Sequence, residues 1–303
     1  MTAVFEQVLI LFTFIAIGYI LSKLEIVKPE HGKILSGILV LVISPCNTFS
    51  TFSRNFTPTY IKTNYTLLIA AVVTIASLAI AAYFVSKLFT KNNYDRRVYE
   101  YSLVMANYGY FGYVLAEGLF GEVGKLNLMV FSIPAGIFTY TYSFARLTKR
   151  TISFKGLINV NIIAIIIGMI VGIFGIPVPS VIAKVSDSAS ACMGPIAMLL
   201  AGIVISQFNI KRLLVSTPAY VMVTLRLVGI PIIAGVILKL LGMNDAVTTS
   251  VMLFVSMPCG MNTIVFPRMV DENCEIGASL ALLSSVLACI TIPLVLTIFG
   301  VTG

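Results

Sequence analysis

The chain has 303 residues, of which 58% are hydrophobic and only 11% are charged, and its formal net charge is +8. A soluble domain carries about 25% charged residues, so most of this chain must face lipid or other buried helices, and a soluble enzyme is not expected. The basic residues are scattered through short loops, which fits cytoplasmic loops beside anionic lipid headgroups and not a nucleic-acid partner.

Ten apolar stretches are long enough, at about 20 residues each, to cross a bilayer as helices. In chain order they are residues 4–22, 33–53, 66–89, 98–120, 126–148, 157–175, 188–207, 214–240, 246–268 and 277–299. The first stretch follows no basic segment and ends in no small-residue cleavage site, so it is expected to stay as a spanning helix. The connections are short, and no inserted soluble domain is expected.

Lysine and arginine lie mainly in the loops that follow the first, third, fifth, seventh and ninth stretches. The opposite side holds only Arg54, Lys62, Lys125, Lys184 and Lys239. Cytoplasmic loops carry the excess of basic residues. We therefore predict a multi-pass membrane protein with both termini on the extracytoplasmic side.

The ten stretches divide into two repeats of five, residues 1–152 and 153–303. Because five is odd, the second repeat would enter the membrane inverted relative to the first. Pro45 recurs as Pro195, and Gly109 recurs as Gly260, at corresponding places in the two halves. Interrupted hydrophobic segments at matching positions of two halves indicate the binding site of a transporter.

The strongest such pair lies in the middle of the fourth and ninth stretches. The residues concerned are Asn107, Gly109 and Gly112, and Pro258, Gly260 and Asn262. A helix broken at mid-membrane is tolerated only inside protein or beside a water-filled cavity. The amides could bind freed backbone groups or a substrate, while glycine allows unusual backbone angles and close approach. If both helices break and cross, the positive N-terminal ends of two half-helices would point at a bound carboxylate. For either motif alone, the alternative is that its residues only serve helix–helix packing.

These segments resemble the auxin efflux carrier family, which includes plant auxin exporters and bacterial malate/malonate permease-like proteins. "ANYGYFGYVLAEGLFG" is similar to the family motif PNTxxxGIPLxxxxYG, with Asn107, Gly112 and Gly121 at matching positions. "MPCGMNTIVFP" resembles the bacterial LPxAxNxxxxA pattern at Pro258 and Asn262. The resemblance covers nearly the whole chain, although two prolines of the plant motif are replaced and the large plant cytoplasmic loop is missing.

The resemblance implies an all-α fold of ten helices in a bacterial inner membrane, with an inverted five-plus-five repeat and broken, crossed helices 4 and 9. It also implies a scaffold from spans 1, 2, 6 and 7 and a transport bundle from spans 3–5 and 8–10, with a homodimer formed through the scaffold. The expected activity is secondary transport of small organic anions, malate-type or auxin-like carboxylates, by an elevator-type alternating-access mechanism, in the direction of export. An ion-coupled carboxylate or bile-acid-type symporter would need acidic ligands beside the breaks, and a transporter-fold sensor would need an added soluble domain.

The expected substrate-binding residues come from both repeats: Asn107, Tyr108, Gly109, Gly112, Pro258, Gly260, Asn262, Pro45, Asn47 and Tyr140. Arg226 and Pro195 are expected to support them. Arg226 is the clearest charge inside a span, so it should face the bundle interior. It could attract an anion or brace the ninth-span break through backbone carbonyls, and bracing is favoured because direct contact could hold an anion too tightly. No cofactor, metal cluster or nucleophile–base pair is predicted.

Overall fold

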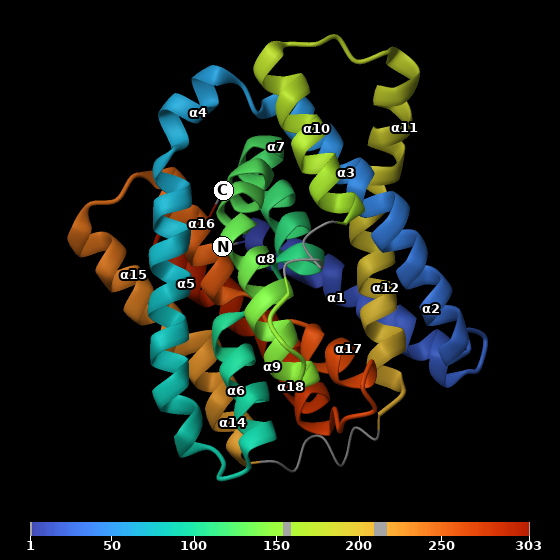
Figure 1. Cartoon of the computed structure of the whole chain (residues 1–303), viewed down its shortest axis with the longest axis vertical. Coiled ribbons are helices and arrows are strands. Elements are labelled where there is room, and N and C mark those ends of the chain that lie inside the picture. Colours follow the sequence, from blue (N-terminus) through green and yellow to red (C-terminus); the bar gives the residue numbers. More distant parts are fainter. Residues whose placement is uncertain (1, 154–158, 209–216, 303) are drawn as a thin grey trace.

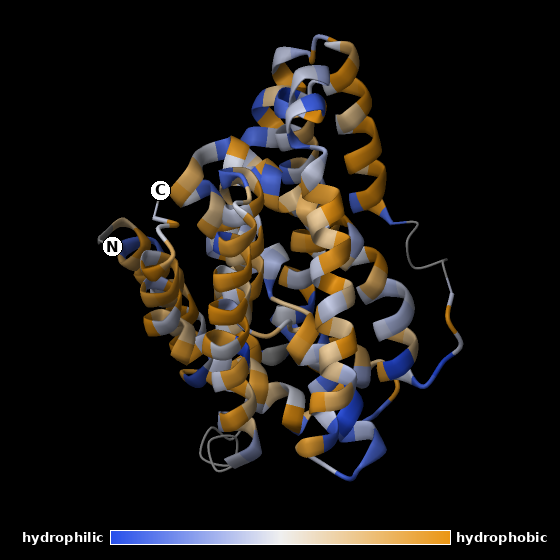
Figure 2. Ribbon diagram, turned by 90° about the vertical axis from the view of Figure 1, so that its left-hand side faces the viewer, coloured by the Kyte–Doolittle hydropathy of each residue, from blue (hydrophilic) through white to orange (hydrophobic). Residues whose placement is uncertain are grey.

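Residues 2–153, 159–208 and 217–302 of the computed structural model are described. Within these ranges helices are joined by turns and loops, and the only β-structure is one isolated bridge (Figure 1). Six described helices are long and apolar enough to cross a membrane, or up to seven if the bent pair Tyr108–Phe131 and Ile133–Thr148 forms one span. Two shorter apolar helices are Val160–Phe174 and Asp245–Ser256. Hydrophobic residues follow most of the helical length, and hydrophilic ones gather toward the loops (Figure 2).

The first half contains α1 (Thr2–Lys23), α2 (Pro29–Ile38), η1 (Leu39–Ile43), α3 (Ser44–Asn55), α4 (Pro58–Asn64), α5 (Thr66–Val85), η2 (Ser86–Leu88), α6 (Asn93–Val104), η3 (Tyr108–Gly112), α7 (Tyr113–Phe131), α8 (Ile133–Phe138), η4 (Thr139–Ser143) and α9 (Phe144–Thr148). The second half contains α10 (Val160–Phe174), α11 (Ser180–Ala191), α12 (Met193–Ser206), α14 (Thr217–Thr224), η6 (Leu225–Gly229), α15 (Ile230–Leu241), α16 (Asp245–Ser256), α17 (Asn262–Arg268) and α18 (Glu275–Ile298).

Local sequence explains where several of these helices begin and end. Asn92 caps α6, because its side chain accepts hydrogen bonds from the backbone N–H groups of Tyr94 and Asp95. Asn244 caps α16 in the same way. Gly175 ends α10 with a φ of 61°, a left-handed conformation that glycine adopts without steric cost.

Two of the expected boundaries are wrong. Gly121, with a φ of 66°, turns the chain inside α7, so the residues just after it already belong to a second helical part. Lys125, which we expected in a loop, is buried in that part. The seventh stretch begins at Ser180 and not at residue 188. The charged residues Lys184 and Asp187 interrupt the apolar pattern, so the first two turns of α11 were left out of the stretch, although this helix packs against α3.

The helices pack in two groups. α1 packs along α12, and α3 packs along α10 and α11, on the right of Figure 1. α5, α6, α15 and α16 lie on the left, with α7 between the groups. Glycines bring the first group into backbone contact: a Cβ at Gly18 or Gly202 would overlap α12 or α1 backbone, and one at Gly172 would overlap the end of α3. Small residues permit such close helix contact within a membrane.

Candidate functional site: crossed helix interruptions beside a buried arginine

Both expected helix interruptions are present in the described structure. α6 ends at Val104 and the helix resumes at Tyr108. α16 ends at Ser256 and α17 begins at Asn262. Each interruption leaves an extended segment of a few residues in the interior of the protein.

The two extended segments satisfy each other's backbone groups. The N–H of Asn107 donates to the carbonyl of Pro258 at 2.8 Å, and the N–H of Gly260 donates to the carbonyl of Met105 at 3.2 Å. These bonds form an isolated antiparallel bridge. Lipid could not satisfy these groups, so the two breaks stabilise one another, and we call this pair of segments the crossover.

Arg226 stabilises the helix ends that enter the crossover. Its side chain is fully buried on the π-helical turn η6. Nη1 donates to the carbonyl of Leu103 and Nη2 donates to the carbonyl of Phe254, both at 3.2 Å. These carbonyls lie in the last turns of α6 and α16, where unpaired C=O groups give a helix its negative end. Arg226 therefore has the bracing role that we expected at the ninth-span break, and it braces the fourth-span break as well.

The two crossover amides are in different situations. Asn107 is 8% exposed, and its side-chain amide has no hydrogen-bond partner among the residues that the structure describes. The Nδ2 of Asn262 donates to the hydroxyl of Tyr101 at 3.1 Å. Asn107 therefore offers a free donor and acceptor at the point where η3 begins, while Asn262 is already bound to protein.

The expected tyrosines line different parts of the neighbourhood. Tyr108 stacks on Phe254, with ring centroids 5.6 Å apart and planes at 27°. Tyr140 is exposed on η4, and its ring lies edge-on to Phe266 of α17 at 6.1 Å. Tyr108 therefore packs at the crossover, whereas Tyr140 lies beside the helix that follows it.

The backbone angles of the three glycines at the crossover differ from our expectation. None of Gly109, Gly112 and Gly260 has a positive φ, so the expectation of unusual backbone angles is wrong. A Cβ at Gly112 would come within 3.2 Å of the Leu128 side chain, and one at Gly260 would come within 3.0 Å of the Tyr101 hydroxyl. At Gly109 nothing lies within 4 Å. Close approach is therefore the requirement at two of the three positions.

The remaining expected residues lie on the other helix group. Pro45 and Asn47 are buried in α3, and Pro195 lies in the first turn of α12. The Asn47 side chain does not reach the crossover bridge; its Oδ1 accepts from Ser190 Oγ at 2.6 Å and from Lys125 Nζ at 3.4 Å. The sequence reasoning missed Lys125 because an isolated lysine between two apolar stretches is typical of a loop.

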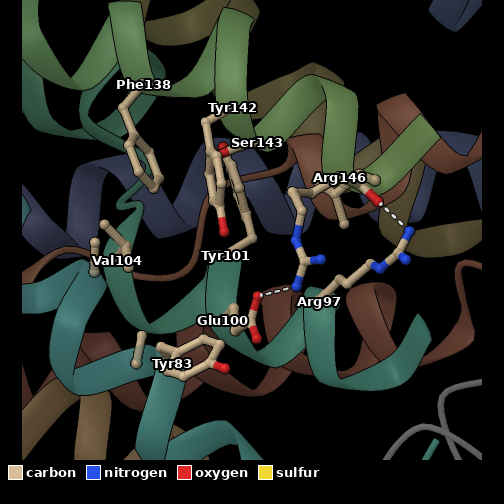
Figure 3. A pocket seen from close by; sticks show the side chains of 12 residues that line it. Tyr83, Arg97, Glu100, Tyr101, Val104, Phe138, Tyr142, Ser143 and Arg146 are labelled. Carbon is tan, nitrogen blue, oxygen red and sulfur yellow. Dashed lines mark hydrogen bonds and ion pairs between the residues drawn. The ribbon is translucent and has the colours of Figure 1, made fainter. Parts of the chain in front are cut away.

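A second polar region, also missed, surrounds a cavity of about 90 Å³ (Figure 3). The carboxylate of Glu100 lies 2.8 Å from Arg146 Nη2 and 3.3 Å from Arg96 Nε. Arg97 Nη1 donates to the carbonyl of Arg146 at 3.0 Å. Tyr101 also lines this cavity and connects it to the crossover through its bond to Asn262. The arginines had been considered only as markers of topology.

An all-helical chain rich in apolar helices, with paired interruptions that meet in the interior, defines the class of membrane transport proteins. The chain belongs to the membrane transport protein family, because the family model of that description matches residues 3–155 and again residues 144–296. It is 25% identical over 305 residues to an uncharacterized transporter of Methanocaldococcus jannaschii, across 95% of this chain and 96% of that protein. The resemblance to the auxin efflux carriers is thereby confirmed, and the protein is a multi-pass membrane transporter.

Proposed function

We propose that this protein is a secondary transporter of small organic anions, and that the crossover binds the carboxylate. The observation that carries this proposal is the distribution of charge around the crossover. A helix end carries roughly half an elementary charge, and the single guanidinium of Arg226 contacts the negative ends of both α6 and α16. The helix formed by η3 and the part of α7 before Gly121 has no such counter-charge at its positive N-terminal end in the described contacts, and the free amide of Asn107 lies at its start.

The ten-span inverted architecture is part of the proposal. One family model matches the two halves separately, which favours a repeat of residues 1–152 by residues 153–303. Equivalent contacts also favour it, since α1 packs along α12 and α10 packs along α3. In this arrangement the scaffold comprises spans 1, 2, 6 and 7, the bundle of spans 3–5 and 8–10 moves against it, and both termini are extracytoplasmic.

Flux measurements on proteoliposomes test the proposal. A panel of labelled mono- and dicarboxylates should contain at least one that the parent protein transports. Asn107→Ala should lower kcat/KM for that anion by about ten- to a hundredfold, the equivalent of losing one hydrogen bond to a charged group. Asn93→Ala makes the same chemical change at an exposed site at the start of α6 and should retain parental flux.

Two results would contradict the proposal. If no carboxylate in the panel is transported while the protein is monodisperse and correctly inserted, the substrate class is wrong. If Asn107→Ala transports as well as Asn93→Ala, the amide at the crossover does not bind the anion.

A further inference from the structure

Lys125 is a buried cation inside the helical part of the protein. It is 3% exposed, and its Nζ lies 2.7 Å from Glu117 Oε1 and 3.4 Å from Asn47 Oδ1. A lysine in a membrane protein's interior is costly and marks a functional site by default. Neither the crossover nor the bracing by Arg226 gives this lysine a role.

The lysine lies on the same helical segment as a residue that packs against η3, the turn that follows the first interruption. Leu128, three residues further along α7, lies against Gly112, which follows the first interruption. Residues three apart are neighbours on one helix face, so the base of the Lys125 side chain lies about one turn, or about 5 Å along the helix axis, from the leucine that contacts Gly112.

The lysine also lies at the boundary between the two helix groups. Lys125 and Glu117 belong to α7, whereas Asn47 belongs to α3 and Ser190 to α11. Asn47 Oδ1 accepts from both Lys125 and Ser190. Its Nδ2 has no acceptor among the residues that the structure describes, although Asn47 is buried. An amide donor of a buried residue therefore remains without a protein acceptor beside the ammonium group.

We propose that Lys125, Asn47 and Ser190 form a carboxylate-binding subsite, and that Glu117 occupies this subsite in the empty transporter. This inference rests on the proposed function and adds a named cation to it. The Glu117 carboxylate already accepts from the ammonium at 2.7 Å, so the subsite accommodates this group. The Nδ2 of Asn47 supplies a donor for the second oxygen of a bound carboxylate.

The exposed fractions of the two side chains indicate which of them leaves the ion pair when a substrate carboxylate binds. The side chain of Glu117 is 42% exposed, whereas the side chain of Lys125 is only 4% exposed. Glu117 can therefore turn outward into a solvated position, while an unpaired Lys125 would remain a buried charge, which is strongly unfavourable. The lysine then pairs with either Glu117 or a substrate carboxylate. Because Glu117 is tethered nearby at a high effective concentration, it competes with the bound anion and promotes its release.

A chemical-rescue experiment tests the subsite without knowledge of the natural substrate. Glu117→Gln should lower the midpoint of thermal unfolding, because it leaves Lys125 unpaired. Acetate at 100 mM should restore the midpoint by about 3–6 °C, and chloride at the same ionic strength should not. The double variant Glu117→Gln with Lys125→Met should show no acetate effect.

Glu122→Gln is the matched control. Glu122 lies on the same helix and pairs with Arg54 at 3.6 Å, but both side chains are well exposed. Acetate and chloride should act alike on this variant. If they also act alike on Glu117→Gln, or if acetate still stabilises the double variant, the pair is a structural link between α7 and α3 and the proposal is overturned.

A flux arm separates this inference from the proposed function. With the anion identified by the carboxylate panel, Glu117→Gln should lower KM at least threefold, and Lys125→Met should raise KM at least tenfold. Unchanged KM values in both variants, with the parent still transporting that anion, would overturn the subsite and leave anion transport intact. Absence of carboxylate flux in the parent would refute the proposed function, while the acetate rescue would still report on the subsite.

Discussion

Replacing Arg226 by leucine should destabilise the protein, because it removes the hydrogen bonds to the C-terminal ends of the two helices that enter the crossover. The guanidinium donates to two buried carbonyls at 3.2 Å each. A buried carbonyl left without a donor costs about 1–3 kcal/mol. Relief of the guanidinium's own burial offsets part of that cost. We therefore expect a net loss of about 2–4 kcal/mol for Arg226→Leu, or a fall in unfolding midpoint of about 4–16 °C.

Thermal unfolding of purified variants measures this loss. Arg226→Lys keeps the charge but lacks the planar fork that reaches two acceptors, so its midpoint should lie between those of the parent and the leucine variant. Arg150→Leu removes an exposed arginine and should leave the midpoint within about 1 °C of the parent, since surface substitutions have small effects. If Arg226→Leu is as stable as Arg150→Leu, the bracing role is refuted.

Three further predictions concern packing, charge and topology. Gly109→Ala should retain parental stability, because nothing lies within 4 Å of its new Cβ, whereas Gly112→Ala should lower stability, because its new Cβ would lie 3.2 Å from a leucine side chain. Equal melting curves for the two variants would contradict this. Glu100→Gln leaves two arginines without their shared carboxylate and should lower the free energy of unfolding by about 1–3 kcal/mol. Thermal or denaturant unfolding of the variant and the parent measures this loss. An unchanged free energy of unfolding would mean that the carboxylate does not stabilise this cluster. Thr2→Cys and Gly303→Cys, each in a cysteine-free background, should react with an impermeant thiol reagent applied outside; labelling only after permeabilisation would reverse the proposed orientation.

The helix interruptions could be predicted from the sequence because their causes are local. Proline removes a backbone donor and glycine weakens a helix, so Pro258 and Gly260 indicate a break wherever the rest of the chain lies. Burial of Arg226 was predictable for a similar reason, since a charge in the middle of an apolar span must avoid lipid. The membrane class and the family followed from composition and from these motifs.

The partners of the buried polar residues could not be predicted, because they depend on how distant helices pack. Lys125 follows the turn at Gly121 and looked like a loop residue until that turn was seen to lie inside α7. The partly exposed Asp187 of α11 accepts from Ser50 and pairs with Arg54, both of α3. The contacts of Lys125 with Asn47 and of Asp187 with α3 join segments more than a full span apart, beyond the range of periodicity or capping patterns.

The direction of transport follows from the charge of the substrate if no ion is coupled to it. Moving one negative charge through 100 mV is worth about 2.3 kcal/mol, which is about a fiftyfold change in the equilibrium ratio. An inside-negative potential therefore drives an anion outward. Three acidic residues lie in the expected apolar stretches, namely Glu6, Glu100 and Glu117. Glu6 is exposed near the start of α1. Glu100 and Glu117 are both engaged by basic side chains, so neither of these two is a free carboxylate for a coupling cation. In substrate-loaded proteoliposomes, an inside-negative potassium-diffusion potential should thus accelerate efflux with no sodium or proton gradient present. Efflux that ignores the potential but follows an imposed ion gradient would refute uniport, and would mean that one of these ion pairs opens to bind the coupling ion during the cycle.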